Sequence, residues 1–322
     1  VRFDVVNFSR EPIEIEVSSE ILGYTEEEIS NHSLPEIGGD KSSRIVVHHC
    51  PKLKRSVLRT INHAVEATLK YEIYLKTNQG RSLYERGTET IKLLPHDMII
   101  WTAKDIQGAS VYDLTKFIGA WITPSDDNGL LDKIRGKAKE FHPKGVLVGS
   151  AGATHISQLT SQVKALYDYL NEKSGISYVN QAFNYDFGAG AQRVLLPERV
   201  LEARTGNCID LTVLFASLME GMGINPLIFL MPGHAFLGWG NKHNKDEMGF
   251  LETTTLGSMN SATGKKFTFE ESFAKAKKTF ESEFIMKGAK NYIPLYSLAF
   301  SESRYLIVDL EEVRKDGIHN ML

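Results

Sequence analysis

The first hundred residues show a two-residue alternation of apolar and polar positions. Ile13, Ile15 and Val17 are separated by glutamates, and the same period returns over residues 69–75. A period of two puts alternate side chains on opposite faces of a β-strand. Asn78-Gln79-Gly80 supplies a turn between such segments. Further strand candidates are the short apolar runs at residues 44–49, 82–83, 91–94 and 98–101. The pattern predicts an antiparallel β-sandwich over residues 1–101.

The period changes beyond residue 111, where apolar residues recur at helical spacing. Residues 156–170 are the clearest case, and Gly175 follows as an expected helix stop. The other predicted helices cover residues 111–121, 130–141, 198–203, 208–222 and 269–284. Strands are predicted at residues 227–231, 235–239, 248–255 and 305–309. We therefore expect an α+β fold with a second, mixed domain over residues 102–322.

Composition and charge narrow the class of protein. The chain has 322 residues, 42% of them hydrophobic, and a net charge of -3. That charge provides no basic field for nucleic acid, and no apolar run approaches the roughly 18–20 residues that span a bilayer. We expect a cytoplasmic protein without a membrane or nucleic-acid partner. Because Val1 replaces a start methionine, we also expect the chain to be a fragment of a longer one.

The chain has two cysteines, Cys50 and Cys208. So few thiols exclude a disulfide framework and a four-cysteine zinc site, and they fit a reducing compartment. His48-His49-Cys50 has metal-ligand residue types, but neighbours on a strand point to opposite faces. We interpret it as a strand end and expect no metal site. The Gly-rich segment 188–193 lacks the Lys-Ser/Thr of a phosphate loop and is interpreted as a loop. The basic residues between 265 and 278 are interpreted as a solvated helix face.

Cys208 follows Gly206-Asn207 at the start of a predicted helix, and asparagine is a good N-cap residue. The positive end of the helix dipole favours a thiolate there, and the free N–H groups can bind an oxyanion. The alternative is a small buried hydrophobic residue. The position therefore makes Cys208 a candidate nucleophile.

His234 and Glu252 are candidates for the base and the acid that orients it. If residues 235–239 and 248–255 form a hairpin centred near His243, His234 lies directly opposite Glu252 and shares its face. A slip of one residue would turn Glu252 away. The alternatives are a core histidine and an edge carboxylate facing water. Together with Cys208, the pair suggests nucleophilic catalysis.

These residues resemble the transglutaminase-like superfamily. The resemblance rests on Gly206-Asn207-Cys208 before a helix, Gly-His234-Ala-Phe, and then Glu252-Thr-Thr, and it extends over about residues 157–309. It is closest to bacterial domains with Gly-His-Ala-Phe, which commonly follow a β-sandwich. The resemblance implies a papain-like core in which Cys208, His234 and Glu252 form a triad. Many members carry aspartate in an Asp-Pro-Thr setting where this chain has Glu252.

The resemblance implies a cysteine hydrolase that cleaves peptide or isopeptide amides in a protein or peptide substrate, without metal or cofactor. Acyl transfer to an amine and a catalytically silent binding module are the alternatives. Asp210 is either a charge that complements the helix dipole or a residue that lines a substrate cleft. Gln192 either donates its amide to the oxyanion or is a surface loop residue.

Overall fold

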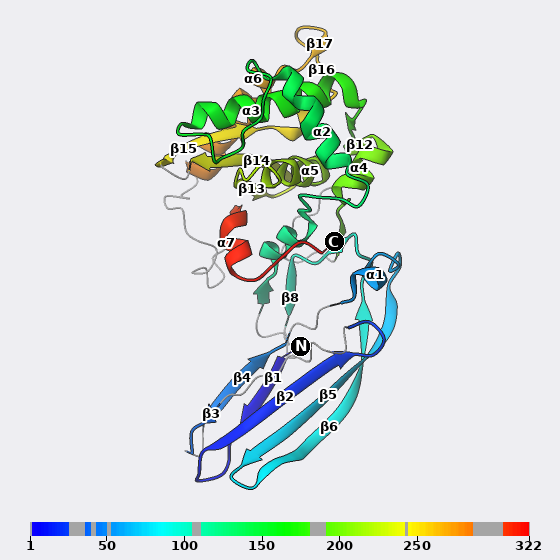
Figure 1. Cartoon of the computed structure of the whole chain (residues 1–322), viewed down its shortest axis with the longest axis vertical. Coiled ribbons are helices and arrows are strands. Elements are labelled where there is room, and N and C mark those ends of the chain that lie inside the picture. The colour runs from blue at the N-terminus through cyan, green and yellow to red at the C-terminus, as the bar shows by residue number, and fades with distance from the viewer. Residues whose placement is uncertain are drawn as a thin grey trace. The chain divides into compact units, whose positions relative to one another are not determined.

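The computed structural model describes residues 2–25, 36–39, 43–49, 53–104, 111–180, 191–241, 244–285 and 305–321. Two compact units, Val1–His96 and Asp97–Leu322, make up the chain (Figure 1). The predicted boundary after residue 101 lies slightly further along the chain. Helices and antiparallel strands occur together, which confirms the predicted α+β class. Among the described residues, no helix is long and apolar enough to span a bilayer.

In its described residues, the first unit consists of antiparallel strands and one short helix, α1 (Arg55–Leu58). A two-stranded sheet pairs β1 (Arg2–Val6) with β4 (Arg44–His48). The four-stranded sheet has the order β3-β2-β5-β6, with β3 (Glu36–Ile37), β2 (Ile13–Ile21), β5 (Val65–Thr77) and β6 (Gly80–Leu93). The two sheets share an apolar cluster built on Ile15, Val17, Ile37 and Val47. That the first unit is the β-sandwich that commonly precedes bacterial transglutaminase-like domains stays a prediction.

β6 is one long strand where the sequence predicts two short ones at its ends. The polar residues in the middle of β6 have no apolar alternation that would predict a strand. They are extended because β6 pairs with β5 along the whole hairpin, and backbone hydrogen bonds hold them there. A shift in pairing between Ile73 and Tyr74 accommodates an extra residue, which is a β-bulge.

The second unit begins with short elements. They are β7 (Met98–Ile99), β8 (Thr102–Lys104), β9 (Val111–Asp113) and the 3-10 helix η1 (Thr115–Trp121). The helix predicted over residues 111–121 is therefore wrong in its first part, because β9 pairs with β8. The spacing of Ile118 and Trp121, both buried, fits the three-residue turn of a 3-10 helix. The apolar spacing alone does not separate that turn from an α-helix.

Helices α2 (Leu130–Ala138) and α3 (Ile156–Tyr169) follow, each continued by a short irregular turn, η2 (Lys139–Phe141) and η3 (Leu170–Ser174). Gly175, with φ 71°, ends the second of them as predicted. The chain then passes through β10 (Ser177–Tyr178), β11 (Gln192–Arg193), α4 (Pro197–Ala203) and β12 (Thr205–Gly206). β11 pairs with β7, and β10 runs parallel to β12.

The central sheet has the order β15-β14-β13-β18, with every pair antiparallel. Its strands are β13 (Pro226–Met231), β14 (His234–Asn241), β15 (Asn244–Leu251) and β18 (Leu306–Asp309). Alternate residues of the strands enter two different apolar clusters, one of them rich in phenylalanine. The remaining elements are β16 (Met259–Asn260), β17 (Lys265–Lys266), α6 (Phe269–Thr279), η5 (Phe280–Ile285) and α7 (Leu310–Lys315).

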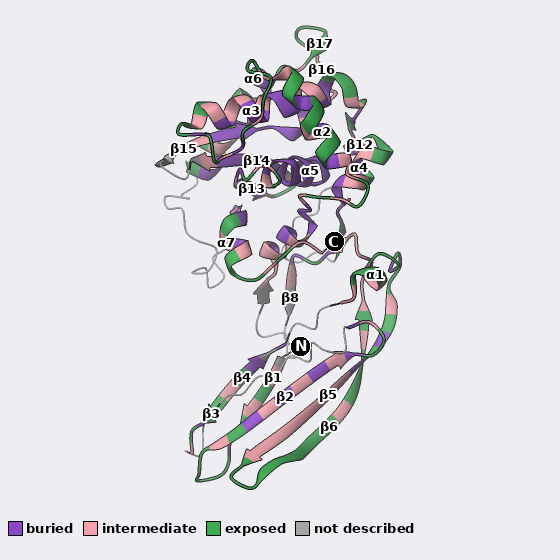
Figure 2. Cartoon of the chain, in the orientation of Figure 1, coloured by how far each residue is buried: buried purple, intermediate pink, exposed green. Residues whose placement is uncertain are grey.

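Helix α5 (Cys208–Glu220) packs against β13 and β14 and is buried along almost its whole length (Figure 2). The sequence predicts one apolar stripe, but Asp210, Thr212 and Ser217 on the other positions are buried as well. A helix enclosed on all sides belongs to the core of its domain. The residue that begins it, Cys208, is therefore held in a rigid frame.

β15 ends at Leu251, four residues before the end of the predicted strand. Glu252 leaves the sheet and caps a 3-10 turn, η4 (Thr253–Thr255). Gly257 follows with φ +68°, and a Cβ at this position would lie 2.1 Å from the carbonyl oxygen of Ile176. Only glycine allows this approach, which brings the chain after η4 against the segment that leads into β10.

Candidate active site

Cys208 is the first residue of α5 and is held by a capping box. The side chain of Asn207 accepts hydrogen bonds from the backbone N–H groups of Ile209 (3.0 Å) and Asp210 (3.1 Å). The Asp210 carboxylate accepts the N–H of Asn207 at 3.0 Å. These reciprocal bonds fix the start of the helix, as Asn207 and the helix pattern predict. The thiol is 3% exposed, close to the positive end of the helix dipole.

His234 begins β14 directly after the Pro232-Gly233 turn. Its Nε2 donates a hydrogen bond to Glu252 Oε2 at 2.9 Å. Burial lowers the pKa of His234, but hydrogen bonds to Cys208 and Glu252 outweigh that effect and raise the pKa to about 9. With Nε2 bound to the carboxylate, Nδ1 is the ring nitrogen that remains for the sulfur. The structure thus connects the imidazole to both of the other predicted residues.

Glu252 is 1% exposed, and both of its carboxylate oxygens are bound. Oε2 accepts from His234, and Oε1 accepts from the N–H (3.2 Å) and the hydroxyl (2.7 Å) of Thr254. Burial raises the pKa of Glu252, but the hydrogen bond and positive charge of His234 bring it below its ordinary value. A carboxylate that stays ionised while buried is suited to hold an imidazolium.

The predicted register of the hairpin is wrong, although Glu252 still lies on the same face as His234, as that register predicted. The pairing of Leu237 with Leu251, continued by one residue, sets Glu252 level with Phe236 instead of His234. The pairing shifts between Gly240, which pairs with Met248, and Asn241, which pairs with Asn244, and this bulge offsets the rest of the hairpin from the predicted register. The pairing is shifted by two residues, so Glu252 keeps the face of His234 and reaches it along the diagonal. Long side chains can cross that diagonal, which favours glutamate over the shorter aspartate at this position.

Asp210 is buried and binds the backbone. Its two oxygens accept the N–H groups of Leu195 (2.8 Å) and Asn207 (3.0 Å). Burial raises the pKa of Asp210, and these two bonds oppose the rise. Of the two roles considered from the sequence, this geometry favours a charge that completes the helix start over a residue that lines a cleft.

Gln192 is 8% exposed, so it is not a surface residue. Its Oε1 accepts a hydrogen bond from Trp101 Nε1 at 3.0 Å. Its Nε2 is buried and has no hydrogen-bond partner among the residues that the structure describes. Gln192 therefore has a donor available, while no described contact joins it to Cys208 or His234.

Tyr178 is a site residue that sequence reasoning missed. Its N–H donates to Leu256 O, and Tyr178 pairs with Gly206, so its backbone lies between the segments that carry Glu252 and Cys208. Burial raises the pKa of the Tyr178 phenol, and the negative charges of Cys208 and Glu252 raise it further. The side chain is partly exposed, and its hydroxyl donates to Asn180 Oδ1 at 3.4 Å. Only the parallel pairing of β10 with β12, two residues before the cysteine, could have indicated this position.

The other features singled out in the sequence can be followed only in part. His49 is buried and its Nδ1 lies 2.9 Å from Ser19 Oγ, whereas Cys50 and most of the Gly-rich segment lie outside the described residues. Across the described ranges, no three metal-binding side chains gather at one place. Phe269 and Ala276 on α6 and Phe284 on η5 are buried. Lys275, Lys277 and Lys278 are exposed on α6 as predicted, whereas Lys265 and Lys266 are exposed but belong to β17 and not to the helix.

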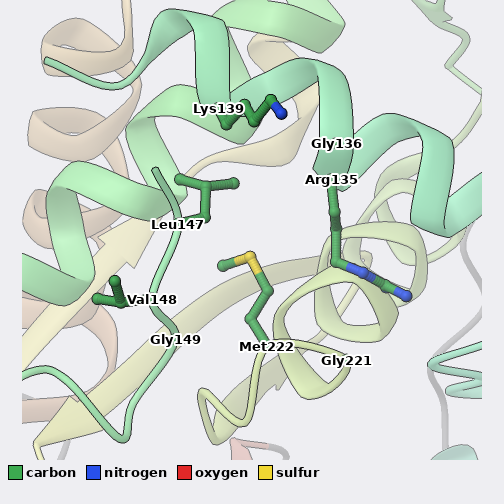
Figure 3. Close-up of a pocket in the computed structure, with 8 residues that line it drawn as sticks. All are labelled: Arg135, Gly136, Lys139, Leu147, Val148, Gly149, Gly221 and Met222. Carbon is green, nitrogen blue, oxygen red and sulfur yellow. The ribbon is translucent and has the colours of Figure 1, made fainter. Parts of the chain in front are cut away.

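A cavity of about 450 Å³ lies at the other end of α5 (Figure 3). Arg135, Gly136, Lys139, Leu147, Val148, Gly149, Gly221 and Met222 line it. The length of the helix puts this end about 20 Å from Cys208. The cavity is thus separate from the cysteine, histidine and glutamate.

Residues 150–226 match the family model of the transglutaminase-like superfamily. The matched segment includes Cys208 and all of α5, while His234 and Glu252 lie beyond its end. A search of curated proteins finds no match to the chain. The match over residues 150–226 confirms the family resemblance drawn from the sequence and supports a papain-like, cysteine-type fold in general.

Proposed function

We propose that this chain, whose residues 150–226 match the transglutaminase-like superfamily, is a cysteine hydrolase that cleaves peptide or isopeptide amides. Members of the superfamily are usually enzymes. The proposed catalytic residues are Cys208, His234 and Glu252. The observation that carries the proposal is the hydrogen bond from His234 to Glu252, formed by an imidazole that also interacts with the helix-start cysteine.

In the proposed reaction, the sulfur of Cys208 attacks the amide carbonyl as a thiolate, and a C–S bond forms. His234, protonated at Nδ1, gives its proton to the leaving nitrogen as the C–N bond breaks. The neutral imidazole then takes a proton from water, whose oxygen attacks the thioester. The acid product leaves, and the thiolate–imidazolium pair is restored.

The negative charge that develops on the carbonyl oxygen needs donors. The backbone N–H of Cys208 is one candidate, because it lies at the positive end of the helix dipole, whereas the Asn207 side chain occupies the N–H groups of Ile209 and Asp210. Gln192 Nε2, which bonds to none of the described residues, is a second candidate. We propose both groups as the oxyanion site, with Tyr178 as part of the wall that the substrate contacts. Asp210 is left out because the backbone occupies both of its oxygens.

The proposed partner is a protein or peptide, with neither nucleic acid nor membrane involved. A net charge of -3 over 322 residues has the same sign as a polyanion and gives no basic field to attract one. The cytoplasm is the proposed compartment, because two cysteines in so long a chain suit a reducing environment. The first unit is proposed to recognise the substrate.

Substitution of the nucleophile is the direct test. Cys208→Ala should abolish release of products from a peptide library, and the thermal unfolding transition should remain. Cys50→Ala is the matched control because it removes the other thiol of the chain, and it should retain full turnover. Retained turnover in Cys208→Ala would contradict the proposed mechanism.

Acyl transfer to an amine is the second candidate, because it uses the same triad and differs only in what resolves the thioester. A glutamine-containing peptide mixed with a labelled amine separates the two reactions. Free acid as the product supports hydrolysis, and incorporation of the label supports transfer.

A catalytically silent binding module is the third candidate. It predicts a Cys208 that iodoacetamide alkylates no faster than a free thiol near neutral pH. Alkylation that is clearly faster, and that Cys208→Ala removes, supports an activated cysteine instead.

A further inference from the structure

The turn that follows Glu252 connects the two ends of the proposed triad. Its first threonine, Thr253, donates its hydroxyl to the carbonyl oxygen of Cys208 at 3.3 Å, and Thr212 on α5 donates to the same oxygen at 2.7 Å. The hydroxyls of Thr253 and Thr212 lie 3.2 Å apart. The backbone of the cysteine and the residue next to the acid are therefore held by one small group of hydroxyls.

The second threonine of the turn binds the acid itself. Thr254 donates both its N–H and its hydroxyl to Glu252 Oε1, while His234 occupies Oε2. A carboxylate held at both oxygens cannot rotate without losing one set of bonds. Hydrogen bonds to the ionised form also favour that form.

We propose that Thr254 is a positioning residue that fixes the Glu252 carboxylate in the rotamer that reaches His234 and keeps it ionised. The inference rests on the proposed function, since it assigns Thr254 to the same site. Glu252 reaches His234 along the diagonal of the hairpin, which requires a long side chain. Because glutamate has one more methylene than aspartate, its side chain also has more rotamers. The bond from the Thr254 hydroxyl removes that freedom.

A purely structural role for Thr254 is the rival explanation. Glu252 caps the 3-10 turn by accepting the N–H of Thr254, and the hydroxyl could simply strengthen the cap. Loss of a cap lowers stability and leaves the ionisation of His234 unchanged. A positioning role changes the ionisation of His234, so its titration separates the two explanations.

Other charged groups near Glu252 must stay constant in such a test. The titratable groups are His234 on β14 and Lys275 on α6, which act on Glu252, Cys208 on α5, which acts on His234, and the Tyr178 phenol on β10. None of them is altered by a substitution at Thr254, and Lys275 continues to favour the ionised form of Glu252 from the side of α6.

The experiment compares Thr254→Val, Thr254→Ser and Thr255→Val with the wild-type chain. Thr255 is the matched control because its hydroxyl belongs to the same turn but bonds to Ser272 (2.6 Å) and the backbone of Glu252 (2.6 Å), away from the carboxylate. The readouts are the NMR titration of His234, the rate of Cys208 alkylation by iodoacetamide, and unfolding. Thr254→Ala replaces Thr254→Val if the latter does not fold.

Thr254→Val should lower the pH at which His234 titrates and slow Cys208 alkylation near neutral pH about tenfold, as expected for one hydrogen bond to a charged group. Thr254→Ser should restore both, and Thr255→Val should lower stability without moving the titration. An unchanged titration in Thr254→Val overturns the role of Thr254 alone. A wild-type Cys208 no more reactive than a free thiol overturns the proposed function and this inference with it.

Discussion

Two turns beside Cys208 each contain a buried carboxylate, and they use it in opposite ways. At the start of α5, Asp210 accepts only backbone N–H groups, and burial leaves its pKa above the ordinary value. After β15, burial is outweighed at Glu252 by His234, and the pKa falls below the ordinary value. Burial of an acid does not by itself indicate a catalytic role. The hydrogen-bond partner determines whether a buried carboxylate stays ionised, because an imidazolium stabilises the negative charge that burial disfavours.

Removing the charge of Glu252 is expected to have the largest effect on activity. Glu252→Gln keeps the shape but should lower kcat by about 10²–10⁴-fold, as for orienting acids in other triads. The reason is that an amide neither stabilises the imidazolium nor enforces its tautomer. Steady-state kinetics with the wild-type protein as reference measures the loss, and a decrease below about threefold would contradict the role of Glu252.

Shortening the acid tests the diagonal geometry of the hairpin. Glu252→Asp keeps the charge but withdraws the oxygen from His234 by about one methylene, so kcat should fall by about 10²-fold. The effect should be smaller than in Glu252→Gln. Activity equal to that of the wild-type chain would show that the diagonal geometry created by the bulge between Gly240 and Asn241 does not require glutamate at position 252.

The pH dependence follows from the raised pKa of His234. Its charged form gains two hydrogen bonds, so the proton is kept through neutral pH and is lost as the pH rises through about 9. kcat should therefore be sustained up to that pH and decline by about tenfold per unit above it, because the leaving nitrogen no longer receives a proton. A rate that declines from about pH 6.5, the ordinary pKa of histidine, would contradict this.

The smallest effect on activity is expected at the other turn. Asp210→Asn leaves a backbone N–H facing an amide and should lower the free energy of unfolding by about 1–3 kcal/mol. The activity of the folded protein should change little, because the carboxylate does not touch the imidazole. Denaturant unfolding and kinetics on the same sample measure both. A large loss of kcat in a folded variant would make Asp210 part of the site.

The sequence predicts much of this site because its strongest signals are local. Asn207 at a helix start, the Pro232-Gly233 turn before His234 and the order of the three residues all follow from short segments. The face shared by His234 and Glu252 follows from the two-residue period of strands, which a shift of two preserves.

The parts that sequence reasoning missed depend on contacts distant in the chain. The bulge after Gly240 changes the register without any apolar signal, and the early end of β15 creates the turn that Thr254 closes. Tyr178 reaches the site only through its pairing with Gly206 and its bond to Leu256. Neither the spacing of apolar residues nor the amino-acid composition indicates which distant residues pair or where a bulge lies.

The most direct test of the central claim is the NMR titration of His234 in the wild-type chain, in Glu252→Gln and in Asp210→Asn. We predict a midpoint at about 9 in the wild-type chain, because both partners stabilise the imidazolium. The midpoint should move clearly lower in Glu252→Gln and stay in place in Asp210→Asn. A wild-type midpoint near 6.5, or one that Glu252→Gln leaves unchanged, would contradict a Cys208–His234–Glu252 triad.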